Sequence, residues 1–140
     1  MENISLMKYL IDTNIWLEIL LDQEKSKEAF DFLSKIDSSS LAISDFSLHS
    51  IVLILTKLKE HKTAKIFLED INTSGVNILT IESNNLYKVV DIIQNLNIDF
   101  DDAYQYYLSK KYNLVLVSFD KDFDKADIKR KTPKELFQGD

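Results

Sequence analysis

Four short apolar runs divide this sequence, and longer segments with helical periodicity separate them. The runs lie at residues 8–11, 41–43, 76–79 and 114–117, and each spans only three or four residues. Strands this short and apolar are typical of a parallel sheet that is buried on both faces. The alternation of strands and helices therefore predicts an α/β domain with three layers, in which helices flank a central, mostly parallel sheet.

The segments between the runs carry apolar residues on one helical face. In the clearest case, residues 86–96, Leu86, Val89 and Ile93 follow the spacing i, i+3 and i+7. We expect residues 46–59 to form a mostly buried helix, because this segment is apolar and contains no Gly or Pro. Further helices are predicted over residues 15–20, 24–36, 63–71 and 102–112, with a short strand near Ile128 and a helical turn at Pro133.

The chain has 140 residues, which is the length of one domain. We interpret residues 1–6 as a short N-terminal extension and residues 7–140 as a single domain, because no repeat, linker or low-complexity segment divides them. The apolar stretches are too short to span a membrane, and the first residues do not follow a signal-peptide pattern. These features predict a cytoplasmic protein with no membrane partner.

The composition excludes several classes of functional site. The chain contains no Cys, which excludes thiol chemistry, disulfides and Cys-ligated metals. Its two glycines, Gly75 and Gly139, are too far apart for a phosphate-binding loop. The net charge of −6 excludes a simple basic nucleic-acid coat protein, because no overall positive field attracts phosphates. A nuclease whose acidic site binds a metal ion is compatible with this charge.

Acidic and polar residues follow the predicted strands at the points where those strands end. The carboxyl ends of parallel strands meet at one edge of a sheet, and ligands of open α/β sheets bind there. Side chains from at least three separate segments are therefore expected to converge. They are Asp12 and Asn14, Ser44 and Asp45, Asp99, Asp101 and Asp102, and Ser118, Asp120 and Asp122.

Carboxylates that are packed closely repel one another unless a cation lies between them. The only histidines, His49 and His61, fall on different predicted elements, so a zinc site built on paired histidines is excluded. The remaining ligands are oxygen atoms, which suit Mg²⁺ best. A metal ion held in this way can activate water and clamp a phosphodiester. The residues therefore predict metal-dependent phosphodiester hydrolysis.

Three segments, taken in order, resemble the PIN-domain family. Lys8-Tyr9-Leu10-Ile11-Asp12-Thr13-Asn14 is similar to the opening strand and first acidic turn of that family. Asp101-Asp102-Ala103 is similar to its acidic helix start, and residues 115–123 (VLVSFDKDF) to its closing segment. The resemblance implies a three-layer PIN-like fold. It also implies an Mg²⁺- or Mn²⁺-dependent endoribonuclease, most often the VapC-like toxin of a toxin–antitoxin pair.

The resemblance also assigns roles to individual residues. By position, Asp12, Asp102 and Asp120 would be the catalytic metal ligands, and Asn14 and Ser118 would orient the site. Taken singly, Asp12 and Asp102 can also be interpreted as ordinary acids at helix starts. The partners implied are an RNA substrate, an antitoxin protein and a second copy of the chain in a homodimer.

One position departs from the family pattern and leaves an alternative open. Where the family usually has a Glu after the second strand, this chain has Ser50. Asp45 is a candidate to supply the missing charge, and Asp101 is a supporting acid that competes with Asp102 for the inward position. We favour Asp102 because Ala103 follows it, as in the family. The alternative function is a degenerate, catalytically weak PIN-like module that binds RNA or a protein partner.

The C-terminal segment 125–134 is locally basic within this acidic protein. Lys129, Arg130 and Lys131 form its centre. One interpretation is a solvated tail with no specific role. The other is a phosphate-contacting edge beside the acidic site, which is a useful arrangement for RNA binding. The sequence does not favour one over the other.

Overall fold

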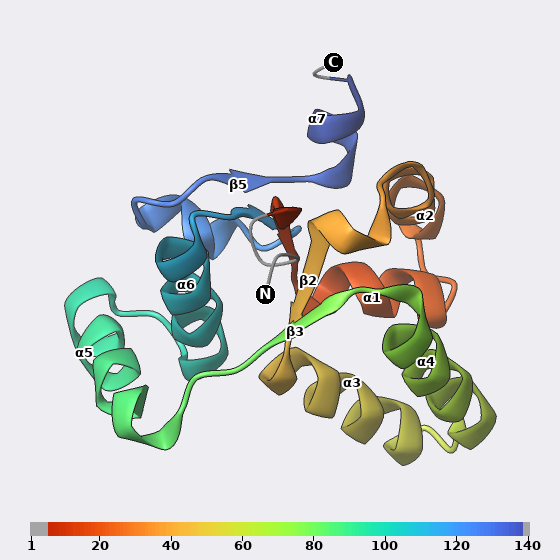
Figure 1. Ribbon diagram of the computed structural model, residues 1–140, viewed down its shortest axis with the longest axis horizontal. Coiled ribbons are helices and arrows are strands. Elements are labelled where there is room, and N and C mark those ends of the chain that lie inside the picture. Colours follow the sequence, from red (N-terminus) through yellow and green to blue (C-terminus); the bar gives the residue numbers. More distant parts are fainter. Residues whose placement is uncertain (1–5, 139–140) are drawn as a thin grey trace.

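The computed structural model describes residues 6–138, whose strands form one five-stranded sheet with the order β3-β2-β1-β4-β5 (Figure 1). All neighbouring strands are parallel. The predicted extension at residues 1–6 lies outside the described residues except for Leu6. The strands are β1 (Tyr9–Ile11), β2 (Leu41–Ser44), β3 (Asn77–Leu79), β4 (Val115–Val117) and β5 (Arg130–Lys131).

Helices cover both faces of the sheet, which confirms the predicted three-layer α/β fold with a parallel sheet. Two helices, α5 and α6, pack together on one side, and α1 to α4 lie on the other (Figure 1). A last short helix, α7, packs against α2. The helices are α1 (Thr13–Leu20), α2 (Ser26–Lys35), α3 (Asp45–Lys57), α4 (His61–Ser74), α5 (Leu86–Leu96), α6 (Phe100–Tyr112) and α7 (Pro133–Gln138). Short 3₁₀ turns are η2 (Ser38–Ser40), η3 (Ser83–Asn85) and η4 (Lys121–Lys125).

The two sides of the sheet have separate hydrophobic cores because successive residues of a strand face opposite sides. Leu10 of β1 and Leu116 of β4 are fully buried in the core beneath α5 and α6. Their neighbours Ile11 and Val117 are fully buried in the core on the other side. This alternation explains why the central strands are apolar at every position.

The prediction that residues 46–59 form a mostly buried helix is wrong in one respect. The segment is helical as α3, but its buried stripe consists of Ser47, Ile51 and Leu55, at intervals of four. Leu53 is 55% exposed, because only one face of α3 contacts the neighbouring layers. Apolar content alone therefore overestimated the burial of this helix.

Asparagines in the left-handed conformation end helices α5 and α6. Asn97 follows α5 at φ 55°, and Asn113 follows α6 at φ 54°. Asn tolerates this conformation better than most residues, so each helix stops sharply and the chain turns. The turn at Asn97 leads into the acidic start of α6. Across residues 6–138, no helix is both long and apolar enough to cross a membrane.

Candidate metal centre

The candidate site forms where β1 and β4 end side by side. These strands pair in register, with Ile11 opposite Val117, so the next residues, Asp12 and Ser118, lie at the same level. The Asp12 backbone N–H donates to the Val117 carbonyl at 2.9 Å, which extends the pairing by one step. The Ser118 hydroxyl then donates to Asp12 Oδ2 at 2.6 Å. Sheet register therefore joins two residues that are far apart in the chain.

Asp12 is buried, and its carboxylate accepts hydrogen bonds on both oxygens. Oδ1 accepts from the Thr13 backbone at 2.9 Å, so Asp12 caps α1, and from Gln105 Nε2 at 2.8 Å. Oδ2 accepts from Ser118, and more weakly from Asn14 Nδ2 at 3.4 Å. Burial raises the pKa of Asp12, although the hydrogen bonds from Ser118, Gln105 and Thr13 oppose this rise. Its ionised form is thus held by specific donors inside a poorly solvated site.

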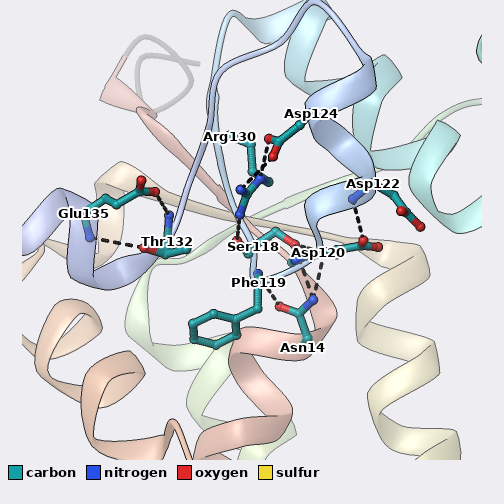
Figure 2. Close-up of polar contacts among 10 residues, drawn as sticks. Asn14, Ser118, Phe119, Asp120, Asp122, Asp124, Arg130, Thr132 and Glu135 are labelled. Atoms are coloured by element: carbon teal, nitrogen blue, oxygen red, sulfur yellow. Dashed lines mark hydrogen bonds and ion pairs between the residues drawn. The ribbon is translucent and has the colours of Figure 1, made fainter.

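Three carboxylates converge beside this anchor. One oxygen each of Asp102, Asp120 and Asp122 lies within 4.8 Å of the others. Asp102 is buried in the first turn of α6, whereas Asp120 is half-buried and Asp122 is exposed after β4. The Asp120 carboxylate also accepts from the Asp122 backbone N–H at 2.9 Å (Figure 2). The sequence analysis expected all three residues at this edge, but it assigned metal binding only to Asp102 and Asp120.

Burial and the neighbouring carboxylates both disfavour ionisation of Asp102. Burial, with smaller contributions from the charges of Asp101, Asp120, Asp12 and Asp99, raises the pKa of Asp102 to about 7. A carboxylate that ionises so reluctantly gains from a neighbouring cation. The ligands offered are carboxylate oxygens, which match the preference of Mg²⁺ and Mn²⁺. The donor set therefore fits a hard divalent ion.

Asp101 and Asp102 have different environments. Asp101 is exposed, and its Oδ1 accepts from the Asp102 backbone N–H at 3.0 Å. Asp102 is only 8% exposed and is the residue shared by both acidic groups on this edge. The second group contains Asp99, Asp101 and Asp102. Asp101 thus lies at the outer side of the cluster, and Asp102 at its centre.

Asn14 and Ser118 connect the ends of β1 and β4. Asn14 Oδ1 accepts from the Phe119 backbone N–H at 3.2 Å, and Nδ2 lies 3.3 Å from Ser118 Oγ (Figure 2). Ser118 Oγ also accepts from the Asp120 backbone N–H at 3.0 Å. These contacts fix the turn that carries Asp120 relative to Asp12.

Asp45 and Ser50 lie outside the acidic groups. The Asp45 carboxylate accepts from the Tyr104 hydroxyl at 2.6 Å and from the Thr80 hydroxyl at 2.7 Å. These partners tie the start of α3 to α6 and to the residue after β3. Ser50 is half-buried on α3. These contacts do not test the hypothesis that Asp45 replaces the missing family acid, but two protein donors to its carboxylate favour a structural role instead.

The sequence analysis assigned no role in the site to three polar residues, Gln105, Ser47 and Thr13. Gln105 Nε2, besides contacting Asp12, lies 3.1 Å from Ser47 Oγ, and the Thr13 hydroxyl donates to that same oxygen at 2.7 Å. Gln105 is 1% exposed. Its position three residues after Asp102, on the same helical face, was the available signal. A buried side-chain amide needs hydrogen-bond partners, and Asp12 and Ser47 accept from its nitrogen.

Arg130 in the basic segment has protein partners. Its guanidinium contacts Asp124 through Nε at 2.9 Å and Nη2 at 3.1 Å, and Nη1 donates to the Ser118 carbonyl at 2.9 Å (Figure 2). Hydrogen bonding with Arg130 lowers the pKa of Asp124. Lys129 and Lys131 are exposed. RNA contact by these three residues stays a prediction, and Arg130 already joins η4 to the end of β4.

The fold and the acidic edge together define a class, the PIN domains. The model of the PIN domain family matches residues 9–129. The chain therefore belongs to the PIN domain family, and the resemblance seen in the sequence is confirmed. No curated protein sequence matches the chain.

Solved structures of toxin–antitoxin proteins are similar to this one. A toxin–antitoxin complex from Klebsiella pneumoniae is 23% identical with a TM-score of 0.68, and the match covers 90% of this chain and 98% of that one. FitAcB from Neisseria gonorrhoeae is 19% identical with a TM-score of 0.70, over 89% and 97%. VapC20 from Mycobacterium tuberculosis, a toxin that cleaves the sarcin–ricin loop, is 14% identical with a TM-score of 0.76, over 86% and 96%. At these identities the similarity is one of fold.

Proposed function

We propose that this chain is a divalent-metal-dependent endoribonuclease and the toxin of a toxin–antitoxin pair. The observation that carries the proposal is the convergence of carboxylates from Asp102, Asp120 and Asp122, near which the Ser118 hydroxyl holds the Asp12 carboxylate. The similarity in fold to VapC20, whose description names RNA cleavage, supports the choice of RNA. The Klebsiella pneumoniae complex supports an antitoxin partner.

Asp12, Asp102 and Asp120 would hold the ion, which is Mg²⁺ or Mn²⁺. Such an ion supplies an acidified water and positive charge beside the scissile phosphate. Asp102 must lose its proton to act as a ligand, and with a pKa of about 7 it does so only near neutral pH. Ser118 and Asn14 hold the Asp12 carboxylate and the turn of Asp120 in place.

Further features of the proposal come from the family resemblance. They are an RNA substrate cut to 5′-phosphate and 3′-hydroxyl products, and a homodimer that presents two sites. The exposed Lys129 and Lys131 would contact phosphates beside the acidic edge.

Metal binding is the direct test, because it does not depend on knowing the RNA. Mn²⁺ and Mg²⁺ are titrated into the purified chain by calorimetry at pH 8, with Asp102→Asn and Asp120→Asn as variants. We expect binding by the wild type and a loss of at least tenfold in affinity in each variant. Cleavage of total RNA that stops on addition of EDTA would then support the nuclease. Absence of binding at millimolar metal would contradict the proposal.

A degenerate binding module is the second candidate, and Ser50 is the observation that favours it. A hydroxyl at this position removes one carboxylate from the set that the family usually offers. The same calorimetric titration separates the two functions. A module that has lost its chemistry would bind RNA or a protein partner without binding Mn²⁺, and Asp102→Asn would leave that binding unchanged.

A further inference from the structure

Gln105 is a buried polar residue of α6 whose side-chain amide contacts the candidate metal ligand Asp12. It lies one helical turn after Asp102 and is 1% exposed. Its Nε2 donates to Asp12 Oδ1 at 2.8 Å and contacts Ser47 Oγ at 3.1 Å. Through these contacts it connects α6 with the ends of β1 and the first turns of α3. No other side-chain amide contacts Asp12 Oδ1 among residues 6–138.

The hydrogen bonds divide the two oxygens of Asp12. Oδ1 receives two donors at ordinary length, from Thr13 and Gln105, and these occupy its two lone pairs. Oδ2 receives one short bond from Ser118, while the contact from Asn14 at 3.4 Å is too long to be strong. The lone pair of Asp12 that is most available to a cation is therefore on Oδ2. The hydrogen bond from Gln105 occupies the second lone pair of Asp12 Oδ1.

The carbonyl oxygen of the Gln105 side chain argues against a purely structural role for this residue. Gln105 Oε1 is buried and has no hydrogen-bond partner among the described residues. A buried acceptor without a donor destabilises the folded state, whereas an apolar side chain of similar length would avoid that penalty. Met would avoid that penalty, but it would also remove the hydrogen bond that Gln105 donates to the buried Asp12 carboxylate. The amide is explained by what its nitrogen does to Asp12.

We propose that Gln105 is a positioning residue of the metal centre, which saturates Asp12 Oδ1 and thereby presents Oδ2 to the divalent ion. This inference rests on the proposed function and deepens it. Residues that hydrogen-bond to metal ligands in this way typically change metal affinity or activity by about 10–100-fold when they are removed. The role requires a donor at the position of Nε2 and does not require the carbonyl oxygen.

The test uses two replacements of Gln105 that differ in the donor. Gln105→Met keeps the length of the side chain and removes the donor. Gln105→His keeps an N–H at a similar reach, because imidazole Nε2 can donate. Gln94→Met, at an exposed position of α5, is the matched control. The Mn²⁺ dissociation constant of each full-length variant is measured by calorimetry, and its thermal midpoint is measured without metal.

We expect Gln105→Met to weaken Mn²⁺ binding by about tenfold or more in a chain whose thermal transition shows that it is still folded. Gln105→His should bind within about threefold of wild type, and Gln94→Met should match wild type. Wild-type affinity in Gln105→Met, or a loss in Gln105→His as large as that in Gln105→Met, would overturn the inference. If Gln105→Met does not fold, weak Mn²⁺ binding by folded Gln105→His would overturn it. If the wild type itself binds no Mn²⁺, the proposed function fails as well. If the wild type binds Mn²⁺ and Asp102→Asn does not, the proposed function stands, and a negative result with the Gln105 variants contradicts only the role of Gln105.

Discussion

The Tyr104 hydroxyl donates to Asp45 Oδ1 at 2.6 Å, and the same hydroxyl oxygen accepts from the Ile81 backbone N–H at 3.1 Å. Tyr104 is buried on α6, whereas Asp45 opens α3. This pair therefore joins two helices on opposite sides of the sheet at its carboxyl edge. Burial and the Asp45 hydrogen bond raise the pKa of Tyr104, so its hydroxyl stays a donor across the working pH range.

Asp45→Asn is expected to lower stability and to leave metal binding unchanged. The amide keeps one acceptor where the carboxylate had two, so the bond from Tyr104 or from Thr80 weakens. Loss of such a bond to a charged group costs about 1–3 kcal/mol. Urea unfolding and Mn²⁺ calorimetry measure the two effects. Tyr104→Phe should show a similar loss, and the double variant should lose less than the sum. Weaker Mn²⁺ binding in Asp45→Asn would instead place Asp45 in the metal centre.

The metal-free chain is expected to lose stability through Asp102 as the pH rises from about 4 to about 7. The pKa of Asp102 is about 7 in the folded chain, against an ordinary value of about 3.9, so the folded state binds a proton that the unfolded state has released. The free energy of unfolding therefore decreases with pH across this window. Solvent screening reduces the effect to about 1–2 kcal/mol.

The difference between wild type and Asp102→Asn isolates this contribution from the other carboxylates. At pH 8 without metal, Asp102→Asn should be more stable than wild type, and the two should converge near pH 4. Thermal unfolding at several pH values measures the difference. With millimolar Mn²⁺ the wild type should gain stability at pH 8 and the variant should not. A gap that is constant with pH would mean that Asp102 has an ordinary pKa.

Ser50→Glu is expected to strengthen Mn²⁺ binding, on the order of tenfold, if the family position on α3 faces the metal. The added carboxylate would restore the acid that the family usually carries there. Ser34→Glu, at an exposed position of α2, adds the same charge elsewhere and serves as the control. Calorimetry measures the Mn²⁺ affinity of the wild type, Ser50→Glu and Ser34→Glu. Equal affinities in all of them would show that residue 50 does not reach the ion.

Lys129→Ala combined with Lys131→Ala is expected to weaken RNA binding and to reduce its dependence on salt. Both side chains are exposed beside the acidic edge. Two lost phosphate contacts on single-stranded RNA should reduce the slope of log K against log salt by about 1.4. Affinity is measured at several salt concentrations with Asp102→Asn, which prevents cleavage. An unchanged slope would favour the solvated-tail interpretation.

Arg130→Lys is expected to lower stability, whereas the variants of Lys129 and Lys131 are expected to change RNA binding. Arg130 Nη1 donates to the Ser118 carbonyl, and Lys cannot keep this bond while also contacting Asp124 with two nitrogens. Loss of the bond to the carbonyl costs about 1–2 kcal/mol. Urea unfolding should show this loss with little change in the salt dependence of RNA binding. A changed slope with full stability would assign Arg130 to the RNA instead.

Local signals predicted most of the fold. The helix at residues 86–96 matches α5 at both ends, because its apolar stripe and the turn at Asn97 are encoded within the segment. The strand β5 was expected near Ile128 but consists of Arg130–Lys131. Two charged residues have no strand propensity of their own, and their pairing with Leu116 and Val117 is what makes them a strand.

The residues of the candidate site also fall into two groups. Some can be predicted from local sequence patterns, and others depend on contacts between distant segments. Asp12 and Ser118 follow strands and could be found from the strand ends. Gln105 could not, because its importance depends on Asp12, which lies 93 residues earlier. The two partners of Asp45 are likewise distant in the chain. Contacts of this kind are set by the packing of helices across the sheet, which the pattern of one segment does not encode.

The bond between Asp12 and Ser118 spans 106 residues of the chain. During synthesis, the first strand leaves the ribosome long before the residues that complete its acidic edge. A growing chain that ends before residue 115 can pair β1 with β2, but it lacks β4, Ser118 and the carboxylate of Asp120. The order of the strands therefore delays assembly of the acidic centre until Asp120 has been added to the chain.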